Sequence, residues 1–214
     1  MVEHRADVVC LHEPPRGRRN IGISHSAYEI RKTKTVWTAI RKGRGLVVDE
    51  WTGLCRGAND NVFATDVSRR GEKKTRIVND YHRGDRQSGE RPAHKLNWQR
   101  VIRRSGTILA GDFNADSRRW DPRCRGQRDA AFWEEVIDET GLEIGNDSQS
   151  THHWTREGHK AESVINLTLA NQPITTWSIL ADDHATGSDH EVTEWEVKLD
   201  RQEEAGHERV VGWN

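Results

Sequence analysis

Short β-forming runs separated by polar loops constrain the fold of this chain more than any other feature of its sequence. We expect strands at residues 6–11, 35–40, 46–48, 61–67, 74–81, 107–110, 163–169, 175–180 and 191–197. Helical spacing of apolar residues predicts helices at 94–104 and 128–140, and the arginine-rich segment 16–34 reads as a loop. This pattern predicts an α/β or α+β domain with layered sheets and no internal repeat.

Composition narrows the class of protein. The 214 residues suit one domain of ordinary size, and 33% of them are hydrophobic while 31% are charged. The sequence contains no apolar run of the roughly 18 residues that a membrane span needs, so we expect no membrane contact. Its N-terminus lacks the charged and apolar regions of a secretory signal. We therefore expect an intracellular protein.

The cysteines and histidines follow no disulfide or zinc pattern. The three cysteines are widely spaced, without a CxxC pair: Cys10, Cys55 and Cys124. An odd number at such spacing argues against a disulfide framework and favours a reducing compartment. Among eleven histidines, two pairs are close in sequence, His152–His153 and His184/His190, and neither has the spacing of a zinc site. The sequence therefore predicts no zinc site.

The net charge of −1 conceals an uneven distribution. Residues 1–128 contain 28 basic and 15 acidic side chains, whereas residues 129–214 contain 5 basic and 19 acidic ones. Two interpretations fit equally well. The two halves could pack together and neutralise each other, or a basic face for a polyanion could lie beside an acidic pocket for a divalent cation.

Acidic, amide and histidine side chains occur where the expected strands end. They are Glu13, Asp112 with Asn114, Asn166, and Asp189 with His190. Because strand ends present side chains at one rim of a sheet, these groups can meet. Carboxylates there suit Mg²⁺, and a neighbouring histidine can act as a general base. The set suits metal-assisted hydrolysis of a phosphate ester.

Each motif has a plainer interpretation by itself. Glu13 could be a solvated loop residue, and Gly111-Asp112-Phe113-Asn114 could be a turn. Ser188-Asp189-His190 could cap a helix or lie in a surface loop. Their joint occurrence in this order favours the catalytic interpretation.

Five segments together resemble the motifs of the endonuclease/exonuclease/phosphatase superfamily: Leu11-His12-Glu13-Pro14, Asn79-Asp80-Tyr81, Gly111-Asp112-Phe113-Asn114-Ala115, Ile165-Asn166-Leu167-Thr168-Leu169-Ala170-Asn171 and Gly187-Ser188-Asp189-His190. Their spelling is most similar to the endonuclease domain that precedes the reverse transcriptase of non-LTR retrotransposons, particularly those found in fungi. The resemblance implies one such domain over residues 1–198. Residues 199–214 would be a charged tail or the start of a linker.

The resemblance implies a four-layer α/β/β/α sandwich, in which two mixed β-sheets are flanked by helices. It also implies Mg²⁺- or Mn²⁺-dependent nicking of DNA, which leaves a 3′-hydroxyl that primes reverse transcription. The implied partners are DNA and the reverse transcriptase domain of the same polyprotein, and the implied place of action is the nucleus.

The resemblance also assigns roles to single residues. Glu13 would be a metal ligand, and Asp189 would assist at the metal. Tyr81 would hydrogen-bond the scissile phosphate. Asp112 would position or deprotonate the attacking water.

Two further roles follow from the same resemblance. Asn114 would hold a phosphate oxygen, and His190 would contact the phosphate or move a proton. Which of Asp112 and His190 is the base stays open.

Two departures from the family pattern predict a weakened enzyme. The family begins with an Asn-bearing strand some tens of residues before the metal-binding Glu, whereas Glu13 stands near the start of this sequence. The missing strand would leave an unpaired sheet edge. The family's Asp before Thr168 is replaced by Asn166, whose neutral amide supports the imidazolium form of His190 poorly. Restoring both features is expected to raise nicking.

Basic side chains in the first half are candidates for contacts with DNA phosphates: Arg16, Arg18, Arg19, Arg41, Lys42, Arg44, Arg118 and Arg119. They favour a polymeric substrate. Two alternatives remain, a superfamily phosphatase acting on a small phosphorylated molecule and a catalytically inactive nucleic-acid-binding remnant.

Overall fold

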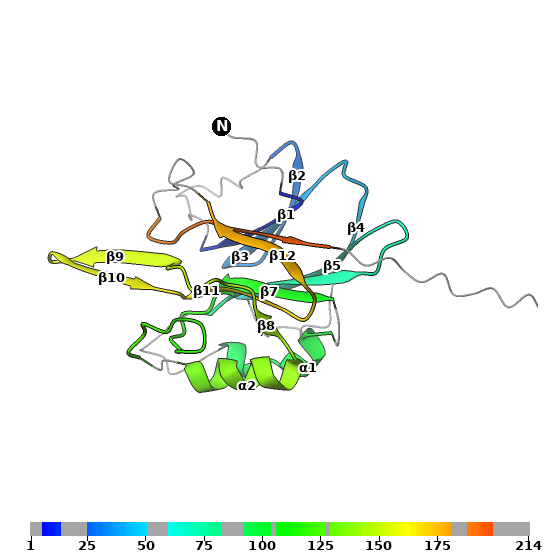
Figure 1. Cartoon of the computed structure of the whole chain (residues 1–214). Helices are drawn as coiled ribbons and strands as arrows, with labels where there is room; N and C mark the ends of the chain where they lie inside the picture. Colours follow the sequence, from blue (N-terminus) through cyan, green and yellow to red (C-terminus); the bar gives the residue numbers. More distant parts are fainter. Residues whose placement is uncertain are drawn as a thin grey trace, which may run out of the picture.

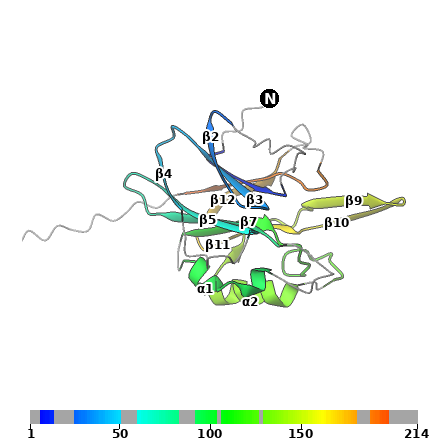
Figure 2. The ribbon, with the colours of Figure 1, turned by 180° about the vertical axis from the view of Figure 1, so that it is seen from behind.

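The computed structural model of the chain shows stacked β-sheets with helices beneath one of them (Figure 1). The structure describes residues 6–13, 25–50, 60–82, 92–103, 106–126, 129–180 and 188–198. The main sheet lies in the middle of the molecule, the smaller sheets lie above it and the helices lie below it. The view from behind shows the same order of layers (Figure 2).

The main sheet has six strands in the order β4-β5-β6-β7-β11-β8. They are β4 (Leu46–Glu50), β5 (Val62–Arg69), β6 (Thr75–Tyr81), β7 (Thr107–Asp112), β11 (Asn166–Ala170) and β8 (Glu143–Ile144). β6 and β7 run parallel, and the other neighbouring pairs are antiparallel. Every residue of β6 and β7 is buried, because other layers cover both faces of these central strands.

The helices cover one face of the main sheet. They are the 3-10 helix η1 (Pro92–Lys95), α1 (Trp98–Val101) and α2 (Ala130–Thr140). Trp98 and Trp133 pack against Val78 and Leu109 of the sheet in the largest apolar cluster. The helix predicted at 128–140 is confirmed as α2, which ends at Gly141 with a left-handed φ of 65°.

The long helix predicted at 94–104 is wrong. Two one-turn helices, η1 and α1, occupy part of this range. Asn97 Oδ1 accepts a hydrogen bond from Arg100 N at 3.1 Å, so a helix begins in the middle of the predicted span. The chain is extended again by Ile102. The apolar residues that suggested helical spacing are buried because the segment lies against the sheet.

Two smaller sheets form the second layer. One has the order β1-β3-β2 and the other pairs β12 with β13. They comprise β1 (Val8–His12), β3 (Val36–Arg41), β2 (Tyr28–Lys32), β12 (Ile174–Ile179) and β13 (Thr193–Val197). The prediction of a loop over 16–34 is wrong at β2, which pairs along β3. Flanking charges had masked its alternation of half-buried Tyr28 and Ile30 with exposed residues.

The second layer is loosely packed around β1 and β13. Among the described residues, β1 pairs only with β3 and β13 pairs only with β12, so one edge of each strand is unpaired. Val8 and Cys10 of β1 and Trp195 of β13 line a cavity of about 1650 Å³ between the layers.

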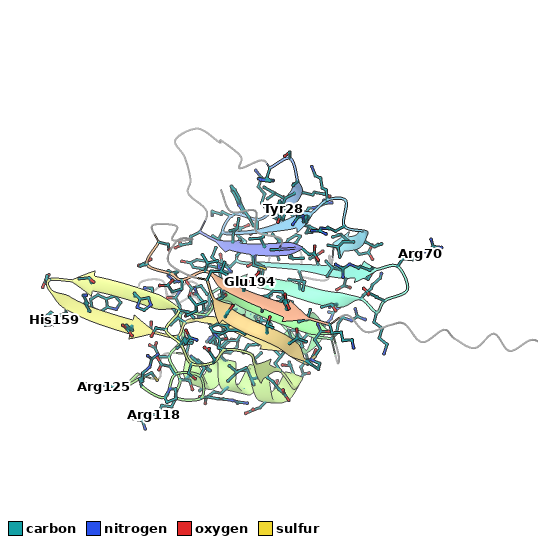
Figure 3. All side chains as sticks on the ribbon, turned by 45° about the horizontal axis from the view of Figure 1, so that its top comes forward. Tyr28, Arg70, Arg118, Arg125, His159 and Glu194 are labelled. Carbon is teal, nitrogen blue, oxygen red and sulfur yellow. The ribbon has the colours of Figure 1, made fainter. Side chains whose placement is uncertain are left out.

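A polar hairpin projects from one end of the molecule (Figures 1 and 2). It consists of β9 (His152–Arg156) and β10 (His159–Ser163), with His159 near its tip (Figure 3). Glu157 and Gly158 both have positive φ, as the tight turns of two-residue hairpins require. The sequence analysis missed this hairpin because backbone pairing and turn geometry, without an apolar stripe, hold it together.

The layered α/β sandwich is confirmed. Within the described residues, however, helices flank only one of the two sheet layers, so three of the four expected layers are present. No helix in the described part of the chain is both long enough and apolar enough to span a bilayer. The expected tail at 199–214 lies outside the described residues.

Candidate active site

Three strands of the main sheet place their functional side chains in one row. Cα pairing sets Tyr81 of β6 beside Asp112 of β7, and Asp112 beside Asn166 of β11. Because β6 and β7 are parallel, their last residues reach the same rim, while antiparallel β11 begins there. Residues far apart in the sequence therefore meet for topological reasons.

Gly111 allows β6 and β7 to approach closely at this rim. A Cβ atom at Gly111 would lie 2.0 Å from the carbonyl oxygen of Asp80, a distance that no side chain tolerates. Packing alone therefore requires a glycine at this position of the Gly-Asp-Phe-Asn motif, whether or not the motif has a catalytic role. It holds Asp112 directly beside Tyr81.

Asn114 orients the carboxylate of Asp112. The backbone N–H of Asn114 donates to Asp112 Oδ1 at 3.0 Å, and its side-chain amide donates to Oδ2 at 2.8 Å. Asn114 adopts a left-handed φ of 46°, a conformation that asparagine tolerates better than most residues. Asp112 itself is buried, so these two hydrogen bonds fix its direction.

The second sheet layer supplies Glu13 to the same cavity. Glu13 follows β1 directly, and its backbone N–H donates to the carbonyl oxygen of Thr35 at 2.9 Å. Its exposed side chain shares the cavity with Tyr81, Asp112 and Asp189. The acidic groups predicted from separate motifs therefore face one space.

The Ser-Asp-His motif is attached to the base of the hairpin. The backbone N–H of His153 donates to the carbonyl oxygen of Asp189 at 2.8 Å. His190 N donates to Ser188 Oγ at 3.1 Å, which closes a local turn. Figure 3 shows the hairpin leaving the sheets at the end opposite Arg70.

Asn166 binds the imidazole of His190 through its oxygen. Asn166 Oδ1 lies 2.9 Å from His190 Nδ1, and because a carbonyl oxygen only accepts, Nδ1 is the donor. Nε2 is then the basic nitrogen of the neutral ring. The amide thus keeps the tautomer that an Asp would select, but it adds no negative charge to support an imidazolium.

The surroundings of His190 favour its neutral form. Burial lowers the pKa of His190, and nearby His152 lowers it further, while Asp189 and Glu13 partly oppose this shift. Glu13 and His190, which come from two separate motifs, also line the same cavity.

His152 is a site residue that the sequence analysis did not assign. Its ring centroid lies 4.6 Å from that of His190, and its Nε2 lies 3.5 Å from Asp189 Oδ2. Its Nδ1 is 3.2 Å from Ser163 Oγ on the partner strand of the hairpin. The adjacent pair His152–His153 is only a weak indication of this site, because its position beside His190 depends on hairpin formation.

His12 also lines the cavity, and its ring stays neutral near pH 7. Burial lowers the pKa of His12 to about 4, although a hydrogen bond with Asn79 opposes this shift and His190 adds to it. Neighbouring Cys10 is not reactive, since burial raises the pKa of its thiol to about 12.

The donor groups at the cavity fit a hard divalent cation. Glu13 and Asp189 offer exposed carboxylates, and Mg²⁺ typically binds one or two carboxylates together with waters and substrate phosphates. A tighter group also exists here: ligand atoms of His152, Asp189 and His190 lie within 4.8 Å of one another. Glu13 does not belong to that group.

Of the seven predicted site residues, six line the cavity and the seventh, Asn114, is hydrogen-bonded to one of them, Asp112.

The basic residues predicted to contact DNA are more scattered. Arg118 protrudes at the end where the hairpin projects (Figure 3), whereas Arg119 forms an ion pair with Asp138 at 2.7 Å. Arg41, Lys42 and Arg44 lie at the end of β3 away from Glu13, because Val36 at its start pairs with His12. Arg16, Arg18 and Arg19 lie outside the described residues.

Comparisons with known proteins agree with this geometry. A sequence profile described as endonuclease-reverse transcriptase matches residues 75–194. The endonuclease domain of TRAS1, a telomere-specific non-LTR retrotransposon, has a similar structure, with a TM-score of 0.68 and 18% identity over 93% of this chain and 87% of that chain.

Two further solved structures share the fold at 13% identity. D. rerio TDP2, complexed with a single-strand DNA product, has a TM-score of 0.53 over 87% of this chain and 84% of that one. An endonuclease/exonuclease/phosphatase family protein from Leptotrichia buccalis C-1013-b has a TM-score of 0.56 over 91% and 87%. At these identities the three structures show the fold alone. A search of curated proteins gives no significant match.

Proposed function

This chain belongs to the endonuclease-reverse transcriptase family, and from that premise we propose that it is a divalent-metal-dependent DNA endonuclease. It would hydrolyse one phosphodiester bond of target DNA and leave a 3′-hydroxyl for a reverse transcriptase domain of the same polyprotein. One observation carries the proposal: carboxylate and imidazole groups from both sheet layers face a single cavity.

Glu13 and Asp189 would hold Mg²⁺ or Mn²⁺ at the cavity. The bound cation would stabilise the negative charge that develops on the phosphate during hydrolysis. Both carboxylates are exposed, so the DNA phosphate can approach them without displacing a protein layer.

Asp112 and Asn114 act as one unit on the attacking water. Because Asn114 fixes both carboxylate oxygens of Asp112, the carboxylate can hold a water in a constant direction. Tyr81, its neighbour in the sheet, would donate a hydrogen bond to the phosphate.

His190 is the second group that can move a proton. Its Nδ1 is bound by Asn166, so Nε2 is the nitrogen available to the substrate or to water. Its lowered pKa keeps this nitrogen unprotonated near neutral pH, as a general base requires. Either Asp112 or His190 can therefore accept the proton of the attacking water.

Nicking of supercoiled plasmid tests the proposal. We expect conversion to open circles with Mg²⁺ or Mn²⁺ and none with EDTA, and loss of activity in Glu13→Ala and Asp112→Asn. Glu157→Ala is the matched control, because this exposed glutamate lies in the hairpin turn. Nicking that persists in Glu13→Ala, or that resists EDTA, would refute the proposal.

A catalytically inactive nucleic-acid-binding domain is the second candidate, and Asn166 is the observation that favours it. With an amide in place of a carboxylate at Nδ1 of His190, the imidazolium form lacks a hydrogen-bonded counter-charge there. Binding of DNA in a gel-shift assay without nicking at any divalent metal would favour this second function over the first.

A further inference from the structure

Three potential metal ligands converge on the helix-covered face of the main sheet, away from the active-site cavity. His82 follows β6, His94 lies in η1 and Asp129 precedes α2. One ligand atom from each lies within 4.8 Å of the other two. Tyr81 and His82 point to opposite faces of the sheet: Tyr81 packs with Val36 and Phe63, which are not on the helix side.

The packing of His82 confirms the side on which this group lies. Its ring makes an edge-on contact with Trp133 of α2, with 5.8 Å between centroids. The ring of His94 stacks on Phe132 of the same helix at 3.8 Å. Two aromatic contacts with α2 therefore hold both imidazoles in place.

The distances suit a tetrahedral ion. Zinc bonds to nitrogen and oxygen of about 2.0–2.1 Å place neighbouring ligand atoms roughly 3.3 Å apart. His82 Nε2 and Asp129 Oδ2 are already 3.1 Å apart. A ligand atom of His94 lies within 4.8 Å of both, and the exposure of its ring offers the ion a path from solvent.

Burial and charge strengthen this argument. The side chain of His82 is fully buried and that of Asp129 is 3% exposed. Buried charged groups in proteins are commonly paired or coordinate metal ions. Two imidazoles and one carboxylate form a donor set that favours Zn²⁺ and related transition metals over Mg²⁺.

We propose that His82, His94 and Asp129 bind one Zn²⁺-type ion, which joins the start of α2 to the end of β6. Such a site does not depend on the proposed nuclease activity. A fourth position would be open to water on the side of His94.

Zinc content after equilibrium dialysis tests this site in the full 214-residue chain. The active-site group containing His152 can also bind Zn²⁺, so the informative quantity is the difference between variants. His94→Gln is expected to bind one equivalent fewer than the unmodified chain. His159→Gln, which removes another exposed histidine, is expected to bind the same amount as the unmodified chain.

Asp129→Asn provides an independent variant, since the amide retains the size and one acceptor of the carboxylate. It should lose the same single equivalent, and the visible absorption of tetrahedral Co²⁺ should be weaker in Asp129→Asn and His94→Gln than in the unmodified chain and His159→Gln. Equal zinc content in His94→Gln, Asp129→Asn and the unmodified chain would overturn the proposal and leave a hydrogen-bonded His82–Asp129 pair.

Discussion

The two faces of the main sheet are built differently. The face that the helices cover is closely packed: Trp98, Trp120 and Trp133 are all buried in one apolar cluster. On the opposite face, β1 is half-buried throughout and β13 alternates between half-buried and exposed residues around a large cavity. The comparison indicates that the helix face provides most of the stability, whereas the open face leaves room for a substrate.

Truncating one tryptophan on each face tests this comparison most strongly. Trp133→Ala should lower the free energy of unfolding by about 3–5 kcal/mol, because its side chain is fully buried between Phe113 and Trp98. Trp195→Ala, on the open face, should cost about 1 kcal/mol. Urea unfolding measures both values, and similar losses would contradict the comparison.

The ion pairs of the two faces form a second matched test. On the helix face, Arg76 binds Asp66 at 2.8 Å with its side chain 8% exposed, and it also donates to the carbonyl oxygen of Val101. Arg76→Ala should cost about 3 kcal/mol because it breaks a largely buried ion pair and leaves Asp66 only the more distant Arg103, 3.9 Å away and 39% exposed. On the open side, Arg69 binds Asp7 at 2.8 Å but is 45% exposed.

Arg69→Ala should therefore change stability by less than about 1 kcal/mol. The same unfolding assay compares the two arginines, and the effect of salt separates them further. Added salt should remove the contribution of Arg69 and leave that of Arg76 largely intact. An equal response of both variants to salt would argue against this assignment.

Restoring a carboxylate beside His190 should change activity more than stability. Asn166→Asp is expected to raise the nicking rate at least tenfold, about 1.4 kcal/mol in the barrier, because the carboxylate supports the imidazolium. It should also raise the pKa of His190, so the rise of rate with pH should move to higher pH. Unchanged rates and an unchanged pH profile would count against His190 as the base.

The smallest expected effect concerns Asp80, a buried carboxyl on the helix face. Neither of its oxygens has a hydrogen-bond partner among the described residues, and burial, with a contribution from Asp112, raises its pKa well above the usual value. A raised carboxyl pKa gives stability that is complete at low pH and is lost as the pH rises.

Asp80→Asn should therefore increase the free energy of unfolding by about 1 kcal/mol at pH 7. The gain should shrink as the pH falls towards 4, where the unfolded chain also protonates the carboxyl. Unfolding experiments at both values of pH measure it. A gain that grows on acidification would show that Asp80 is ionised in the folded protein.

The central strands and α2 were predictable because their apolar residues follow local periods of two and 3.6. The predictions failed for segments whose structure depends on contacts beyond the local pattern. β2 depends on pairing with β3, the hairpin depends on its turn, and the 94–104 helix is divided by the cap at Asn97. Local patterns do not contain these interactions.

The sequence by itself determined the chemical identity of the site, since carboxylates, amides and imidazoles stand at the ends of recognisable strands. Only the tertiary structure decided which groups meet. In the folded chain the side-chain oxygen of Asn166 contacts His190, and His152 lies beside Asp189. His82, His94 and Asp129 lie together on the helix-covered face of the main sheet. The physical reason is that residue type and periodicity are local properties, whereas a contact depends on how distant segments pack.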